Sequence, residues 1–502
     1  MTTCANTTNT GTATTGKNLK KLTLLHSNDL HGDFLAEEID KKLVGGVSYL
    51  SGYLDKVRTE EKNVIYAIAG DMFRGSVIDS EFKGISTIEI MNLLGPDVAT
   101  IGNHEIDYGV SHLLFLEKCS TFPIVNANLH ISTNGRRLFM PETIIEIDGM
   151  KILFIGIITE EVLAAAKSDT MVGTFLDIEE AAVDVGRICN AYNATDIDFT
   201  VLLTHIGFEE DQRLAAELDP LWGVDVIIGG HSHTFMDEPC VVNGIPIVQA
   251  GTGTDQIGRF DIMIDTDNNC IDTFTWQSIP ICSETCPRDE VLEELILSYK
   301  DRTDQKYGRV ITRFKCRLTH PSRTQETALG NLVADAFRES LGVDIMFAGS
   351  GSIRNEQAGP IVTFGNLNEL FPYDDAIYQI SVTGAQVRRM LQHMLRDEAW
   401  AGHTEFYQLS KGMRVTYNRT TREIEKLNFK GKPIDEQAVY TVGVQAYHYT
   451  NLKDFLDVTP EECEANAPIR TLCTSARDVL EEFLISHSNL KRSVEGRLVL
   501  KD

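Results

Sequence analysis

The chain lacks a hydrophobic run long enough to cross a membrane, and it lacks an excess of basic residues. No window of the 502 residues approaches the ~18 continuous apolar residues that a spanning helix needs. Lysine and arginine number 46 against 73 acidic residues, for a formal net charge of −27. Such a charge repels polyanions and disfavours a groove for nucleic-acid polymers. We therefore expect neither a membrane span nor a nucleic-acid partner.

The N-terminus lacks the features of a secretory signal, which needs a basic start and ~7–15 apolar residues. Its first 16 residues are rich in Thr and Asn instead, and we interpret residues 1–19 as a disordered tail. The expected location is cytoplasmic, or secreted or periplasmic if a leader was removed. Ten cysteines are scattered, and only Cys282 and Cys286 lie close together. Without a second pair they predict free thiols or a local disulfide, not a structural zinc site.

The length predicts more than one domain, in an α/β chain. We expect a first domain over residues 20–285, a helical linker over 286–308, and a smaller second domain over 309–502. Within the linker, 289–305 reads as an amphipathic helix with candidate packing residues Val291, Leu292, Leu295, Leu297 and Tyr299. Buried strands are expected from the apolar runs at 22–26, 64–69, 98–101, 151–158, 199–203 and 224–228.

Polar motifs stand where five of these runs end, the position at which α/β sheets place their sites. They are Ser27-Asn-Asp-Leu-His31, Gly70-Asp71, Gly102-Asn-His-Glu-Ile-Asp107, Thr204-His-Ile-Gly207 and Gly229-Gly-His-Ser-His233. Each motif alone is more often a turn or a core pair. Together they supply the carboxylate, imidazole and amide ligands of two metal ions. The predicted ligands are Asp29, His31, Asp71, Asn103, His205, His231 and His233.

Two metal ions held close together commonly catalyse the hydrolysis of phosphate esters. Asp71 offers two oxygens and is the predicted bridge between the ions. His104, beside Asn103, is suited to protonate the leaving oxygen, and Asp107 is suited to hold its ring in one tautomer. We assign Glu105 and Asn28 roles in positioning the backbone. The ligand types accept Zn, Mn, Fe or Co and do not select among them.

These motifs resemble the signature of calcineurin-like metallophosphoesterases, and Asn-His-Glu-Ile-Asp107 with Gly109 resembles the version found in 5'-nucleotidases. The resemblance implies a four-layer αββα sandwich of two mixed sheets over the first domain. It also implies one metal bound by Asp29, His31, Asp71 and His233, and a second bound by Asp71, Asn103, His205 and His231. His104 and Asp107 would form the catalytic dyad.

The second domain carries three distinctive runs: Leu329-Gly-Asn-Leu-Val-Ala-Asp335, Gly349-Ser-Gly-Ser-Ile-Arg354 and Phe371-Pro-Tyr-Asp374. Over most of residues 311–455 their order resembles the α/β C-terminal domain of 5'-nucleotidases. That resemblance implies that Arg354 contacts a nucleotide and that Tyr373 stacks on its base. From the residues alone, Arg354 reads as a surface cation at a turn. Ser350 and Ser352 depart from the family's glycine run.

A further departure lies in the segment Tyr447–Asp454, which replaces the family's Phe followed by Gly-Gly-Asp-Gly. We expect Tyr447 or Tyr449 to form the other half of a base sandwich, and Asp454 to bind the ribose. The expected activity is removal of phosphate from nucleoside 5'-monophosphates. A 2',3'-cyclic-nucleotide phosphodiesterase with 3'-nucleotidase activity, or a hydrolase of UDP-sugars, would use the same ligands. A DNA nuclease and a non-catalytic nucleotide sensor are more distant alternatives.

Overall fold

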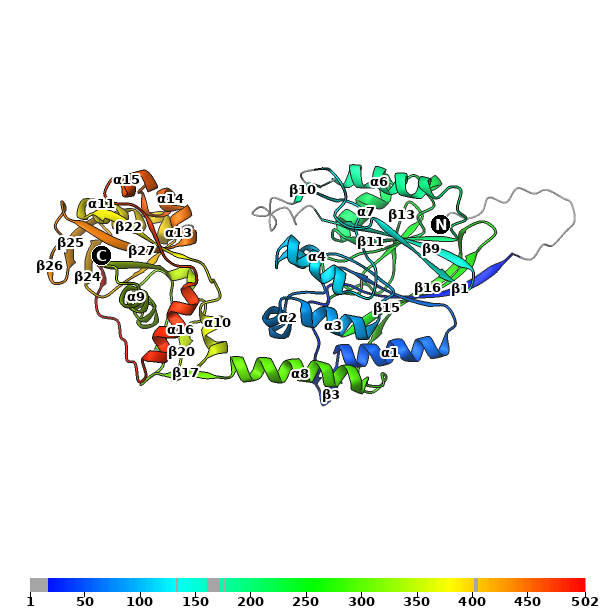
Figure 1. Ribbon diagram of the computed structural model, residues 1–502, viewed down its shortest axis with the longest axis horizontal. Helices are drawn as coiled ribbons and strands as arrows, with labels where there is room; N and C mark the ends of the chain where they lie inside the picture. Colours follow the sequence, from blue (N-terminus) through cyan, green and yellow to red (C-terminus); the bar gives the residue numbers. More distant parts are fainter. Residues whose placement is uncertain (1–16, 132–133, 160–171, 176, 401–404, 502) are drawn as a thin grey trace, which may run out of the picture. The chain divides into compact units, whose positions relative to one another are not determined.

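The computed structural model describes residues 17–131, 134–159, 172–175, 177–400 and 405–501. The predicted tail lies outside these residues up to position 16, and strand β1 begins at Leu19. The chain divides into two compact units, Met1–Thr303 and Asp304–Asp502, which we call unit 1 and unit 2 (Figure 1). Within the described residues, no helix is both long and apolar enough to cross a membrane.

Unit 1 contains two six-stranded mixed sheets within its described residues. In the first, the parallel strands β1, β4, β5 and β6 continue into the antiparallel hairpin β15–β16. In the second, β9, β11, β12 and β14 are parallel, and β8 and β13 are antiparallel edges. The bounds of the first sheet are β1 Leu19–Ser27, β4 Val64–Ala69, β5 Val98–Thr100, β6 Ile124–Val125, β15 Gln256–Asp265 and β16 Cys270–Pro280. Those of the second are β8 Glu142–Ile147, β9 Met150–Ile158, β11 Phe199–His205, β12 Val226–Ile228, β13 Cys240–Val242 and β14 Ile245–Val248.

The two sheets pack face to face because their strands are apolar on both faces. On β4, Ile65, Ala67 and Ala69 join the core between the sheets, whereas Tyr66 and Ile68 point the other way into the core beneath the helices. Helices α1 (Val47–Glu60), α3 (Ile85–Leu94) and α4 (Val110–Cys119) cover the first sheet. Helices α6 (Ile178–Ala191) and α7 (Phe208–Glu217) cover the second (Figure 1). The predicted αββα sandwich is confirmed.

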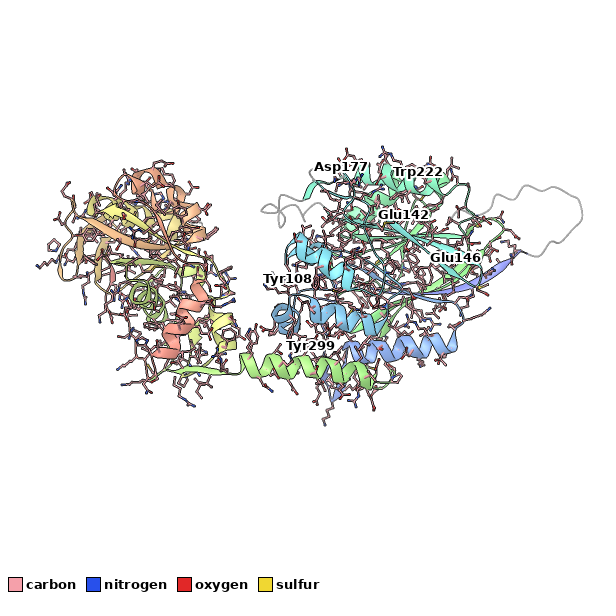
Figure 2. The ribbon with its side chains drawn as sticks, in the orientation of Figure 1. Tyr108, Glu142, Glu146, Asp177, Trp222 and Tyr299 are labelled. Carbon is pink, nitrogen blue, oxygen red and sulfur yellow. The ribbon has the colours of Figure 1, made fainter. Side chains whose placement is uncertain are left out.

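Helix α8 (Glu290–Tyr307) forms where the sequence predicts a linker helix. Leu292, Ile296 and Tyr299 recur at helical spacing and are buried against unit 1. The Tyr299 hydroxyl donates to Glu89 at 2.6 Å, and Figure 2 labels this tyrosine. The predicted packing of Val291 and Leu297 is wrong. They lie off the packed face, with 69% and 43% of their surface exposed. Upstream of the helix, Cys282 and Cys286 are both free thiols.

Unit 2 is a smaller α/β unit, as expected. Its described part holds a five-stranded sheet in the order β23-β19-β27-β22-β28 and a four-stranded sheet in the order β26-β25-β24-β29. The strands are β19 Ile345–Gly349, β22 Ile377–Thr383, β23 Tyr407–Leu409, β24 Met413–Asn418, β25 Glu423–Phe429, β26 Lys432–Pro433, β27 Val439–Gln445, β28 Arg470–Cys473 and β29 Leu498–Lys501. Helices α9 (Ala328–Leu341), α11 (Gly384–Met394) and α16 (Ala476–Ser486) pack on the sheets.

The run Leu329–Asp335 lies on α9 and is buried. Its last residue, Asp335, receives hydrogen bonds from Arg497 Nη1 at 2.7 Å and Nη2 at 2.8 Å. Both side chains are almost completely inaccessible to solvent. The pair therefore ties the end of the chain to α9, and this run is structural.

Candidate metal centre

The predicted ligands of unit 1 stand at the carboxyl ends of strands in both sheets. Asp29 and His31 follow β1, Asp71 follows β4, and Asn103 follows β5. His205 is the last residue of β11, and His231 and His233 follow β12. Five of the seven have a positive φ, which is uncommon outside glycine and costs free energy unless the surroundings enforce it. These five are Asp29, His31, Asp71, His231 and His233.

One group of side chains consists of Asp29, His31 and His233. The Nε2 atoms of His31 and His233 are 3.0 Å apart. Asp29 Oδ1 lies 3.4 Å from the His233 Nε2 and 3.9 Å from the His31 Nε2. Because His31 Nδ1 faces the carbonyl oxygen of Phe73 at 3.3 Å, its Nε2 carries the lone pair. A cation is the natural partner for two imidazole nitrogens that converge beside a buried carboxylate.

A second group consists of Asp71, His205 and His231. His205 Nδ1 donates to the carbonyl of Ala69 at 2.8 Å, and its Nε2 lies 3.1 Å from Asp71 Oδ2. This Nε2 is buried and, among the described residues, makes no well-aligned hydrogen bond, although it faces the Asp71 carboxylate. His231 Nδ1 lies 2.8 Å from Asn103 Oδ1. A buried imidazole nitrogen that faces a carboxylate without a well-aligned hydrogen bond needs an explanation, and ligation of a shared metal ion supplies one.

Asp71 contacts both groups, since its Oδ2 is also 3.8 Å from His31 Nε2. Burial opposes ionisation of this carboxyl, but the neighbouring His205 imidazole and the His104 backbone N–H outweigh it and lower the pKa of Asp71 to about 2. An ionised carboxylate between two imidazole groups fits the predicted bridging role.

His104 and Asp107 lie on and beside the short 3-10 turn η1 (Asn103–Ile106). His104 Nδ1 and Asp107 Oδ2 are 2.8 Å apart, and this hydrogen bond raises the pKa of His104. The His104 side chain is 39% exposed, and its ring centroid is 5.4 Å from that of His31. His104 also joins a third group with His31 and Asp71. The His104 ring is therefore accessible from solvent beside the predicted ligands, where a substrate oxygen can reach it.

The backbone around the ligands is held by buried side chains. The Glu105 carboxylate accepts backbone N–H groups from Asp71 at 2.9 Å, Met72 at 2.7 Å and Phe73 at 3.2 Å, and also from Gly102. Asn28 donates to Asp29 Oδ2 at 2.7 Å and accepts from the backbone of Ala250 at 2.8 Å. Their predicted roles in positioning the backbone are confirmed.

A second polar network is absent from the sequence-based prediction. Gln249 accepts from the Ser232 hydroxyl at 3.0 Å and donates to Asp211 at 3.1 Å. Asp211 also bonds the Thr204 hydroxyl at 2.6 Å, next to His205. The network supports the loop that carries His231 and His233. A polar residue directly after the apolar strand β14 is the signal that marks Gln249, as it marks the ligands.

In unit 2 the structure brings Arg354 and Tyr373 together. Both are exposed, and the guanidinium carbon lies 5.9 Å from the centre of the ring. Tyr447 is also exposed, and its backbone N–H donates to Asp375 at 3.2 Å, two residues after Tyr373. Tyr449 instead stacks on Tyr378 with ring centroids 4.5 Å apart, and Asp454 is an exposed residue of α14 (Leu452–Leu456).

The two serines of the Gly/Ser loop are buried and hydrogen-bonded. Ser350 accepts from Gln408 at 2.9 Å, and Ser352 accepts from Gln445 at 3.1 Å. Gly349 is sterically required, because a Cβ there would lie 2.1 Å from the His448 ring. The departure from the family's glycine run therefore leaves the tight approach at Gly349 intact.

Comparison with known proteins agrees with this architecture. Residues 22–235 match the family model for calcineurin-like phosphoesterases, and residues 308–458 match that for the 5'-nucleotidase C-terminal domain. The mouse (Mus musculus) 5'-nucleotidase is 24% identical, over 95% of this chain and 90% of that protein. The trifunctional nucleotide phosphoesterase YfkN of Bacillus subtilis is 27% identical, over 74% of this chain and 27% of its own length.

Among solved structures, a 5'-nucleotidase precursor from Thermus thermophilus aligns with a TM-score of 0.58 and 25% identity. The alignment covers 96% of this chain and all of that chain. Both domains and their order are shared. The chain therefore has the two-domain architecture of the 5'-nucleotidases, a calcineurin-like phosphoesterase domain followed by a 5'-nucleotidase C-terminal domain, and it is a metal-dependent phosphoester hydrolase.

Proposed function

We propose that the protein removes the phosphate from nucleoside 5'-monophosphates with two divalent metal ions. The observation that carries the reaction is the His104–Asp107 pair beside two convergent groups of His and Asp ligands. The choice of a nucleotide is supported by Arg354 and Tyr373, an exposed cation over an exposed aromatic ring, in the domain that matches 5'-nucleotidases. The substrate is a small molecule, not a nucleic-acid polymer, because the chain carries a net charge of −27.

We assign one ion to Asp29, His31, Asp71 and His233, and the other to Asp71, Asn103, His205 and His231. Bound there, two divalent ions would activate a water near neutral pH and neutralise charge on the phosphate. The residue types suit Zn, Mn or Fe. The buried Nε2 of His205, which faces Asp71, and the facing nitrogens of His31 and His233 support this assignment.

The chain's own groups handle the leaving oxygen and the nucleoside. His104 donates a proton to the ribose 5'-oxygen as it departs, which such an alkoxide requires. Asp107 accepts from His104 Nδ1, keeps the proton to be transferred on Nε2 and stabilises the charged ring. Arg354 binds the anionic end of the nucleotide, and Tyr373 stacks on the base with Tyr447 or Tyr449 as its counterpart. Asp454 is the proposed ribose ligand.

A substrate panel tests this proposal. AMP and 3'-AMP would be compared directly by phosphate release. For 2',3'-cyclic AMP and UDP-glucose, phosphatase would be added after the reaction, to release phosphate from the monoester products. The trifunctional B. subtilis relative is the reason to include the other nucleotides. We expect the highest kcat/KM with AMP. If AMP were inert while the cyclic ester or UDP-glucose turned over, the proposed substrate would be wrong.

We also propose a cytoplasmic location, since Cys282 and Cys286 are free thiols only a few residues apart, as a reducing compartment favours. Fractionation of cells that express the native gene tests this. Recovery of the protein outside the cell or in the periplasm would contradict it.

A further inference from the structure

Arg74 lies three residues after the predicted ligand Asp71 and is held in place by two contacts. Its backbone has a φ of 66° and donates its N–H to Asp79 Oδ2 at 2.9 Å. Asp79 is fully buried, and the same oxygen accepts the Tyr108 hydroxyl at 2.5 Å. The Arg74 guanidinium lies over the Tyr108 ring, 5.3 Å from its centre, and Figure 2 labels this tyrosine. Asp79 therefore anchors both the backbone of Arg74 and the ring on which its side chain rests.

The guanidinium of Arg74 is directed at the catalytic dyad. Its Nε donates to Asp107 Oδ2 at 2.7 Å, and this is the oxygen that lies 2.8 Å from His104 Nδ1. One carboxylate oxygen is thus shared by a guanidinium from the loop after β4 and an imidazole from the turn after β5. Without Arg74, the partly exposed Asp107 side chain would be held mainly by His104, a ring that must itself move a proton.

We propose that Arg74 is a positioning residue of the phosphoester hydrolysis. It fixes the rotamer of Asp107, and through Asp107 it holds His104 with its Nε2 turned toward the leaving oxygen. Arg74 acts through the carboxylate and touches no reacting atom. The inference rests on the proposed acid role of His104, but it applies to any phosphate ester whose leaving group needs a proton.

The expected consequence is a loss of kcat with little change in KM. Removing a residue that orients a functional group commonly costs 10–100-fold. The loss must depend on the leaving group, because p-nitrophenolate departs without protonation whereas a ribose alkoxide does not. A residue that bound the phosphate directly would instead raise KM for both kinds of substrate.

The experiment compares wild type, R74M, D107N and R74M/D107N on AMP and on p-nitrophenyl phosphate. Methionine keeps the packing on Tyr108 and removes every donor. We expect R74M to lower kcat for AMP by about 10–100-fold, with KM and the p-nitrophenyl phosphate rate within about twofold of wild type. The double variant should be no slower than D107N, because both changes act on the same hydrogen-bonded set of Arg74, Asp107 and His104. Equal losses on the two substrates, additive losses, or a rise in KM alone would overturn the proposal.

A matched control is R388M. Arg388 makes the same kind of contact, with its Nε 2.9 Å from Glu436, and its side chain is 39% exposed against 44% for Arg74. It should leave all rates unchanged. Retained p-nitrophenyl phosphate turnover shows that R74M is folded. Failure of the proposed substrate would appear in wild type as inert AMP, and the alkyl ester that wild type does hydrolyse would then replace AMP in the comparison.

Discussion

The backbone N–H of His104 donates a 2.9 Å hydrogen bond to Oδ1 of Asp71. This hydrogen bond therefore fixes the position of the proposed proton donor relative to the proposed bridging ligand, although 33 positions separate the two residues. Asp71 Oδ2 remains directed at His205 and His31. Any displacement of the β4 loop would move the ligand and the donor together.

Replacing Asp71 with Asn should abolish turnover. Asparagine keeps an oxygen for the His104 N–H but removes the negative charge that faces His205 and His31. The several kcal/mol that metal ions contribute to such reactions correspond to roughly a 10³-fold loss of kcat. Steady-state kinetics with AMP and metal analysis by plasma emission would be made on the same preparation. Full activity with unchanged metal content would rule out the bridging role.

Changing His104 to Gln should remove the proton donor and leave the ligands in place. A positioned acid contributes about 10²–10⁴-fold, so we expect a loss of this size with AMP and a much smaller one with p-nitrophenyl phosphate. The control is H487Q, since His487 contacts Phe483 at the end of α16 in unit 2. Equal losses on both substrates would assign His104 to binding or structure instead.

Asp211 should make the stability of unit 1 depend on pH. Burial raises the pKa of this carboxyl from 3.8 to about 7. The contribution of Asp211 to the free energy of unfolding is therefore fully present below pH ~4. It is lost as pH rises toward ~7, by at most about 1.4 kcal/mol per pH unit. Asparagine mimics the protonated acid, so D211N should gain stability relative to wild type between pH ~4 and ~7. Urea unfolding of chelator-treated protein measures this, and parallel pH curves would show that the carboxyl does not titrate as described.

Tyr373 should contribute to binding through the base alone. Stacking of a base on an aromatic ring is worth about 1–3 kcal/mol, so Y373A should raise KM for AMP by roughly 10–100-fold. The rate with p-nitrophenyl phosphate should not change, and Y373F should behave as wild type because it keeps the ring. An unchanged KM for AMP in Y373A would remove Tyr373 from the proposed site.

Much of the fold follows from the apolar runs. All six predicted strands form, with ends that differ by a few residues, because buried parallel strands are apolar on both faces. Convergence of the motifs within each sheet then follows, since parallel strands bring their carboxyl ends to one edge of a sheet. The face-to-face packing of the two sheets brings His205, His231 and His233 to the other ligands. The hairpin β15–β16 is absent from the predicted strands, although Phe260, Ile262 and Ile264 alternate as a half-buried strand does.

Other features depend on contacts that no spacing in the sequence reveals. The positive φ of Asp29 and His31 arises where backbone N–H groups of this loop bond Gly70 and Asp71 across the sheet. The bonds of Gln249 to Ser232 and of Arg74 to Asp107 join loops distant in the chain. For Val291 and Leu297 the helical spacing predicts packing that the structure does not form, because α8 carries more apolar residues than its packed face holds. The ligand and substrate roles stay predictions until variants are measured.

In the proposed mechanism, hydrolysis of AMP needs two divalent ions held by the seven ligands around Asp71. Protein stripped with a chelator would be titrated with Mn²⁺ while AMP hydrolysis and bound metal are followed together. We predict that activity returns in step with metal and reaches its plateau at two equivalents per chain, and that D71N recovers none. Full activity at one equivalent, or activity that persists after metal is removed, would contradict the account.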